Sequence, residues 1–232
     1  MRILRVRLTA AQATVEALRR FYGDQLGIPV FDDGSQHWFG AGGTRLEFSP
    51  TSEREPFYHF ALRVPRNRFV AARKWLARHA ELLSEPDSNE TTFQFPNWQA
   101  EACYAHDPGG NIVELIAHRG LPDESPDSGP FAPTELLGVC EIGLVGYDTP
   151  AMARALEALG IKLWDGTLEL PGRLAFMGAP DGTLILAATG RRWMPTGREA
   201  ELFEVNVDVA GAQDAEVALP GTPHRVRTVT GR

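Results

Sequence analysis

The strongest constraint on the fold is an order of strand and helix patterns that occurs more than once along the chain. Residues 3–8 alternate between apolar and polar side chains, as in a half-buried strand. Apolar residues at helical spacing follow over about residues 11–25, and Gly27 stands where a helix C-terminus favours glycine. Three short strands are then predicted near residues 28–32, 36–40 and 44–49. This order is a βαβββ module.

The same order begins again at Phe57. Residues 57–64 alternate, with Tyr58 and Phe60 on one face and His59 on the other. A helix is predicted over residues 67–79, and strands are predicted near residues 81–85, 91–96, 99–105 and 111–117. A unit this long that occurs only a few times indicates paired modules and not a repetitive array.

A stretch rich in Pro, Gly, Ser and acidic residues, 119–134, is typical of a linker. Beyond it the pattern returns, with a strand at 139–145, a helix from Thr149-Pro150 to Gly160, and strands near 161–164, 173–178 and 183–188. A fourth copy opens at 202–209, with too few residues left for a helix and three strands. We therefore expect a complete two-module domain over 1–118 and a second, truncated domain over 135–232.

The composition excludes several classes of partner. A formal net charge of −7 over 232 residues argues against nucleic acid or an anionic membrane as the main partner. No stretch approaches a membrane-spanning length, and the N-terminal residues lack an apolar signal region. Cys103 and Cys140 are too few for a disulfide framework, so both are expected as buried thiols. We expect a cytoplasmic monomer or homodimer with a small-molecule substrate or ligand.

The segment YAHDPGGNIVELIAH, residues 104–118, places a carboxylate, Glu114, inside an apolar strand. Burying a lone carboxylate costs several kcal/mol unless a cation or hydrogen-bond donor meets it. Alternation puts Glu114 on the face opposite Leu115, which would pack under the helix. His59 lies on the corresponding face of its own strand. We therefore expect Glu114 to face His59. Either a metal or another cation lies between them, or His59 is a neutral core histidine hydrogen-bonded to the carboxylate.

Three segments resemble the vicinal oxygen chelate superfamily, which includes glyoxalase I, bleomycin- and fosfomycin-resistance proteins and extradiol dioxygenases. The segments are ALRRFYGDQLGIPV (17–30), FYHFALRV (57–64) and DPGGNIVELI (107–116). The resemblance is strongest over 1–118. It implies an α+β fold in which paired βαβββ modules form a half-barrel sheet with helices on the outer face. It also implies a divalent metal held by the first and last strand of each module.

The resemblance points to four positions, which are Arg5, Glu47, His59 and Glu114. It implies that Glu47, His59 and Glu114 bind one Zn, Ni, Mn or Fe ion, and that Glu47 or Glu114 acts as a catalytic base. A guanidinium stays protonated and cannot coordinate a cation, so Arg5 departs from the pattern. Either the three other residues complete the metal site, or Arg5 replaces the metal by pairing with a carboxylate, and no metal binds.

Further side chains fall on the same predicted face or near it. Arg7, Arg45 and Arg63 either form an anion-steering mouth or reach solvent at the rim. Trp38, Trp98 and Tyr104 either line the pocket or pack in the core, and His106 is either a proton-transfer group or an exposed histidine at a loop edge. In the second half the equivalent positions are Glu141, Leu186 and Glu204. They include no histidine and predict a poor metal site in a degenerate copy.

Two functions follow from the resemblance. The first is a metal-dependent enzyme that acts on a small oxygenated metabolite. One histidine with two carboxylates favours lyase- or isomerase-type proton transfer over dioxygenase ring cleavage. The alternative is a non-catalytic drug- or metabolite-binding protein like those of the bleomycin-resistance branch, in which Arg5 replaces the metal. A purely structural double module is a third interpretation.

Overall fold

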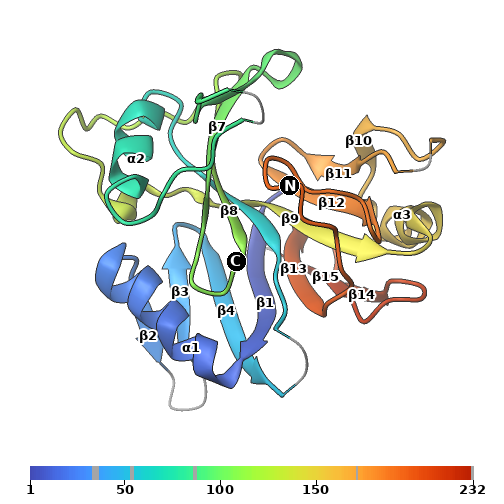
Figure 1. The fold of residues 1–232 in the computed structure, drawn as a ribbon. Helices are drawn as coiled ribbons and strands as arrows, with labels where there is room; N and C mark the ends of the chain where they lie inside the picture. Colours follow the sequence, from blue (N-terminus) through green and yellow to red (C-terminus); the bar gives the residue numbers. More distant parts are fainter. Residues whose placement is uncertain (33–36, 53–54, 86–87, 171, 231–232) are drawn as a thin grey trace.

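The computed structural model describes all residues except 33–36, 53–54, 86–87, 171 and 231–232. The chain has the expected α+β fold, with two curled sheets and few helices (Figure 1). No helix among the described residues is long and apolar enough to cross a membrane.

The first two modules follow the predicted order closely. The first consists of β1 (Ile3–Ala11), α1 (Gln12–Arg19), a π-helical turn η1 (Arg20–Gln25), β2 (Val30–Asp32), β3 (His37–Ala41) and β4 (Thr44–Thr51). The second consists of β5 (His59–Arg63), α2 (Phe69–Leu76), β6 (Phe93–Phe95), a 3₁₀ turn η2 (Pro96–Trp98), β7 (Ala100–His106) and β8 (Ile112–His118). The strand predicted at 81–85 is reduced to one bridge between Leu82 and Ala105. Gln36, the predicted start of β3, lies outside the described residues.

The second half repeats the pattern once in full and once in part. After a 3₁₀ turn, η3 (Pro133–Glu135), the third module has β9 (Gly138–Gly146), α3 (Thr149–Ala158), β10 (Leu163–Gly166), β11 (Ala175–Ala179) and β12 (Gly182–Ala188). The Asp148 side chain caps α3 by accepting a hydrogen bond from the Ala151 amide. The fourth module has β13 (Val205–Gly211), β14 (Ala215–Ala218) and β15 (Arg225–Thr230). Its described residues include no helix.

The sheets do not join the modules in the expected pairs. In one sheet the strand order is β14-β15-β13-β1-β4-β3-β2, which pairs the first module with the fourth. In the other it is β10-β11-β12-β9-β5-β8-β7-β6, which pairs the second module with the third. The expectation that residues 1–118 form one half-barrel was therefore wrong. Alternation specifies which face a strand buries but not which strand lies at its edge.

The stretch predicted as a linker holds the second and third modules together. Arg68, at the start of α2, binds both carboxylate oxygens of Glu135 at 2.7 and 3.0 Å, and both side chains are buried. Asn67 exchanges hydrogen bonds with the backbone of Ser125. These contacts keep residues 119–134 close to α2, so β9 can add to the sheet beside β5.

Apolar residues on the two faces of the sheets make two cores. The larger contains Val6, Phe60 and Ile142 from both sheets and packs under the helices. The smaller contains Ala61, Ile116 and Ile185 and lies on the opposite face of the eight-stranded sheet. That opposite face is the one on which His59 and Glu114 lie.

The DPGGN turn before β8 connects the first module to the second. The buried Asp107 carboxylate accepts hydrogen bonds from the Tyr22 hydroxyl at 2.7 Å and from the Gly109 and Asn111 amides. The Asn111 side chain accepts from the Tyr58 amide at 2.9 Å. Gly110 has φ +72°, a conformation that a turn requires and that glycine adopts without strain. The turn thereby sets the start of β8 relative to β5.

Candidate active site

His59 and Glu114 meet on the inner face of the eight-stranded sheet. His59 opens β5 and Glu114 lies at the centre of β8, the strand that pairs with β5 in parallel. His59 Nε2 lies 3.0 Å from Glu114 Oε2, and the two side chains are 7% and 3% exposed. The Tyr104 hydroxyl on β7 is also hydrogen-bonded to Glu114. The expected meeting of these two side chains is observed, as a direct contact.

A second buried carboxylate, Glu141, comes from the third module. Glu114 on β8 and Glu141 on β9 both pair with Ala61, from opposite sides of β5. Directly paired residues share a face, so the two carboxylates and His59 lie on the same side of the sheet. Neighbouring strands lie about 5 Å apart, which places the two glutamate backbones roughly 10 Å from each other. Glu141 therefore faces the same space as Glu114.

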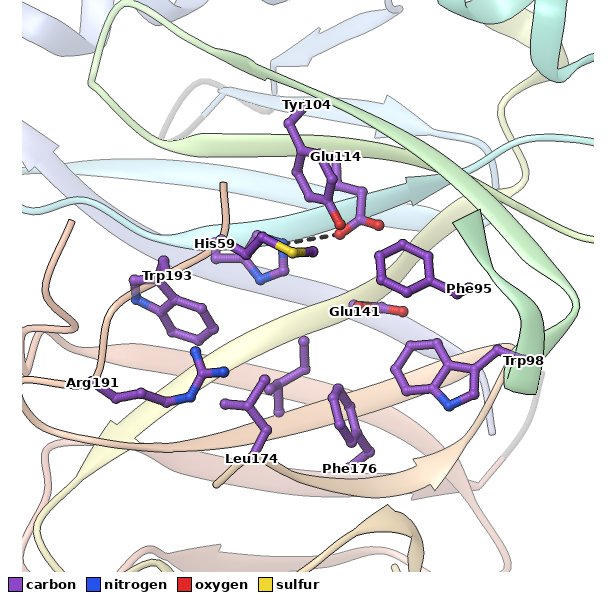
Figure 2. A pocket seen from close by; sticks show the side chains of 12 residues that line it. His59, Phe95, Trp98, Tyr104, Glu114, Glu141, Leu174, Phe176, Arg191 and Trp193 are labelled. Carbon is purple, nitrogen blue, oxygen red and sulfur yellow. Dashed lines mark hydrogen bonds and ion pairs between the residues drawn. The ribbon is translucent and has the colours of Figure 1, made fainter. Parts of the chain in front are cut away.

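Aromatic rings surround this space and leave a cavity of about 130 Å³ (Figure 2). Its aromatic walls are Phe95, Trp98, Tyr104, Phe176 and Trp193. Trp193 comes from the segment after β12, and its ring centroid lies 5.1 Å from that of His59. Gly143 on β9 makes room for it, since a Cβ there would lie 2.9 Å from the indole. The pocket is thus an apolar chamber with a few convergent polar groups, which is the usual character of a ligand site.

Burial determines the protonation states in the pocket. Loss of solvent raises the pKa of Glu114 to about 8, against the opposing hydrogen bond from Tyr104. Burial, together with the charge of Glu114, raises the pKa of Glu141 to about 8. Burial lowers the pKa of His59 to about 4. All three groups are therefore mostly neutral near pH 7, and the His59–Glu114 contact is a hydrogen bond and not an ion pair.

The donor atoms in the pocket suit a divalent metal in kind. His59 Nδ1 and Glu141 Oε1 are buried and have no hydrogen-bond partner in the described structure. An imidazole nitrogen and carboxylate oxygens are ligands that Zn, Ni, Mn and Fe accept. As placed, however, no three His, Cys, Asp or Glu side chains among the described residues lie close enough together to hold a metal ion. Such a site would need Glu141 to approach the His59–Glu114 pair.

The seven-stranded sheet has the corresponding positions but different chemistry. Glu47 on β4 and Asn206 on β13 both pair with Arg7 of β1, and Arg5 lies two residues before Arg7. By this register Arg5, Glu47 and Asn206 occupy the places of His59, Glu114 and Glu141. Arg5 Nη2 donates to Glu47 Oε2 at 2.8 Å, and Arg45 binds the other oxygen of the same carboxylate. Two guanidinium groups thus neutralise the buried Glu47 carboxylate in this sheet.

The predicted site residues are therefore divided between two sheets. Glu47, expected as a metal ligand and catalytic base beside His59, lies instead in the other sheet between two arginines. The expectation failed because the first module pairs with the fourth, so Glu47 belongs to a different inner face.

The other predicted pocket residues also separate. Arg7 binds Asp208, which also binds Arg227, and Arg63 binds Asp123. Trp38 lies under the Arg45 guanidinium at 3.7 Å in the seven-stranded sheet. His106 lies at the end of β7 beside a different hollow. Of this group, the structure places Tyr104 and Trp98 in the pocket with His59.

Several residues that line the pocket were not predicted as site residues, and four of them show why. Glu141 was assigned to a degenerate copy, although VCEIGLV surrounds a glutamate with apolar residues just as NIVELIA does around Glu114. Ile185, and not the predicted Leu186, faces the pocket from β12. Arg191 and Trp193 lie in an irregular segment whose sequence has no periodicity to identify them.

Comparisons with solved structures agree with the fold described above. No family model and no curated protein matches the sequence. Among solved structures, a provisionally named dioxygenase from Bacillus subtilis has a TM-score of 0.58 and 13% identity, with 98% of this chain and 85% of that chain covered. A variant of glyoxalase I from Zea mays has a TM-score of 0.54 and 13% identity, with 98% and 93% covered. The chain shares the fold of the vicinal oxygen chelate superfamily.

The raised pKa of Glu141 predicts how stability depends on pH in the metal-free protein. Because this carboxyl titrates near 4.5 when unfolded and near 8 when folded, the folded chain binds more protons between these values. The free energy of unfolding should fall as pH rises through this interval, by up to about 1.4 kcal/mol per pH unit for each such group. Urea unfolding at several pH values should show a shallower fall in Glu141→Gln. Parallel curves for the two proteins would contradict a buried, neutral Glu141.

Removing the Arg5 side chain tests the ion pairs around Glu47 in the seven-stranded sheet. Arg5→Ala should lower the free energy of unfolding by about 1–3 kcal/mol, because the buried Glu47 carboxylate then keeps Arg45 alone. Arg225→Ala is the control, since Arg225 and its partner Glu216 are 60% and 50% exposed and their pair should contribute less than about 1 kcal/mol. Equal urea midpoints for Arg5→Ala and the parent chain would show that Arg45 alone suffices for Glu47.

Proposed function

We propose that the pocket of the eight-stranded sheet is the active site of a metal-dependent enzyme that transfers protons on a small oxygenated metabolite. The observation that supports this best is the presence of two buried carboxylates and a histidine on the inner face of one sheet, inside an aromatic chamber. The shared fold with glyoxalase I and a dioxygenase adds support for an enzyme of this general kind.

Glu114 is suited to accept and return a proton. It is held by the Tyr104 hydroxyl on one side and by His59 on the other, so its carboxyl group has a fixed orientation. A catalytic acid or base works best when its pKa lies near the working pH, and burial brings the pKa of Glu114 into that range. Glu141 is the second proton carrier, because its free oxygen faces the same chamber.

The residues that would hold the metal are His59, Glu114 and Glu141. A bound divalent ion would supply Lewis-acid stabilisation of negative charge on the substrate oxygens. Metal binding requires ionised carboxylates, so loading would release protons from this pocket near neutral pH. The aromatic walls would exclude water from the substrate while these side chains move the proton.

A second candidate function is ligand binding without chemistry. One observation favours it, namely that His59 and Glu114 bind each other directly and no three metal-binding side chains converge among the described residues. A further feature is consistent with it, since the equivalent position in the other sheet holds Arg5 in an ion pair. The size of the chamber argues against a large drug as the ligand, because pockets for drug-sized molecules usually exceed about 300 Å³.

Metal content distinguishes the two functions. Elemental analysis of untagged protein, purified without chelator, should give about one equivalent of Zn, Ni, Mn or Fe, as the three-residue site implies. Glu114→Gln should lose this metal, because an amide is a weaker ligand than a carboxylate. Glu47→Gln is the matched control, since it changes the equivalent residue of the other sheet and should retain the metal. Metal-free protein after incubation with all four ions would leave ligand binding as the function.

Proton transfer can be measured without knowing the natural substrate. In D₂O, the metal-loaded protein should accelerate exchange of the hydrogens next to the carbonyl in a panel of small carbonyl compounds that includes pyruvate and hydroxyacetone. Proton NMR follows the loss of signal. The acceleration should disappear in Glu114→Gln and fall in Glu141→Gln, whereas Glu47→Gln should keep it. Equal exchange in all four proteins would argue against these carboxylates as proton carriers.

A further inference from the structure

Arg191 is a cation in the wall of the pocket that no carboxylate neutralises. Its Nε donates to the Gly172 carbonyl at 3.2 Å, and its Nη1 donates to the Arg192 carbonyl at 2.7 Å. Within the described part of the chain it makes no ion pair. The guanidinium also lies 5.9 Å from the Trp193 ring centroid, in a position that is only partly exposed. Two main-chain carbonyls therefore hold the group in place without cancelling its charge.

Three other partly or fully buried arginines pair with carboxylates, whereas Arg73 binds the Thr91 hydroxyl. Arg5 binds Glu47, Arg7 binds Asp208, and Arg68 binds Glu135. The acidic side chain in the groove next to Arg191, Asp165, accepts a hydrogen bond from the Trp98 indole instead. The neighbouring Arg173 adds a second positive charge, which together with burial lowers the pKa of Arg191. The mouth of the pocket thus has a surplus of positive charge in a chain whose net charge is negative.

The size and shape of the chamber limit what it can bind. An apolar cavity of about 150 Å³ in another protein holds one benzene molecule, and the chamber here measures about 130 Å³. Its walls are flat rings, which favour a flat ligand by stacking. The Trp193 ring lies 5.1 Å from His59 and 5.9 Å from the Arg191 guanidinium carbon, so one ring with its substituents can span from Arg191 to His59.

We propose that Arg191 is the specificity-determining residue of this pocket, and that it binds the carboxylate of a single-ring organic acid whose ring lies among Trp98, Phe176 and Trp193. The planar guanidinium matches a carboxylate with two parallel hydrogen bonds. The opposite end of the ring then faces His59 and Glu114 (Figure 2). This inference rests on the proposed function only in taking the chamber as the substrate site.

Calorimetric titration with benzoate and benzamide tests the assignment. The two probes have the same ring and nearly the same size, and they differ in charge. The parent protein should bind benzoate about tenfold or more tightly than benzamide, because a hydrogen bond to a charged group is stronger and a neutral amide forgoes it. Arg191→Gln should weaken benzoate by a similar factor and leave benzamide unchanged. Arg191→Lys keeps the charge without the planar fork and should recover part of the affinity.

Arg192→Gln is the matched control, since Arg192 is adjacent in sequence, exposed, and absent from the pocket wall. It should bind both probes as the parent does. Benzoate binding that is unaffected by Arg191→Gln, or equal affinity for both probes in the parent protein, would overturn the assignment. Failure of both probes to bind the parent protein would overturn it as well, because the chamber would then not accept a single ring.

The result of the benzoate and benzamide titration does not depend on whether the protein is an enzyme. Arg191-dependent benzoate binding by a protein that takes up no metal and exchanges no protons would leave the assignment standing and remove the proposed function. Metal uptake and proton exchange without any preference for benzoate would support the proposed function and overturn the assignment of Arg191.

Discussion

A carboxylate at the centre of a sheet's inner face needs a partner on the neighbouring strand, and this requirement organises both halves of the molecule. Glu114 meets His59 in one sheet, and Glu47 meets Arg5 in the other. In each case the partner lies on the first strand of the same module, at the same register. Each sheet therefore pairs a buried carboxylate at the equivalent position, with a histidine in one sheet and an arginine in the other.

That single difference decides which sheet can be a site. A guanidinium neutralises its carboxylate permanently and fills the space between the strands, so Glu47 is held by Arg5 and Arg45. A neutral imidazole shares one hydrogen bond with Glu114 and leaves its other ring nitrogen unpaired. The titratable pair with an unpaired ring nitrogen therefore lies in the sheet with the histidine. The ion pairing that the sequence raised for Arg5 thus occurs in one sheet, and the His59–Glu114 pair lies in the other.

Alternation and turn chemistry predicted much of this from sequence. They identified the order of the modules, the buried faces and the approach of Glu114 to His59, because the period of two and the DPGGN turn are local properties. They failed on the pairing of modules, since edge partners are chosen by contacts far apart in sequence. Because this pairing was predicted wrongly, Glu47 was assigned to the site and Glu141 was not. Arg191 could not be found, because an irregular segment has no period that reveals its orientation.

The pocket consequently depends on both halves of the chain. His59 and Glu114 come from the second module, Glu141 comes from the third, and the segment that supplies Arg191 and Trp193 follows β12. The sheet that contains the pocket has two modules with a helix each, whereas the fourth module, without a helix among its described residues, pairs with the sheet that Arg5 neutralises. A shortened module is tolerable there because ion pairs, and not a shaped cavity, occupy that inner face. The sheet with both helices is the one that holds the apolar chamber around two carboxylates.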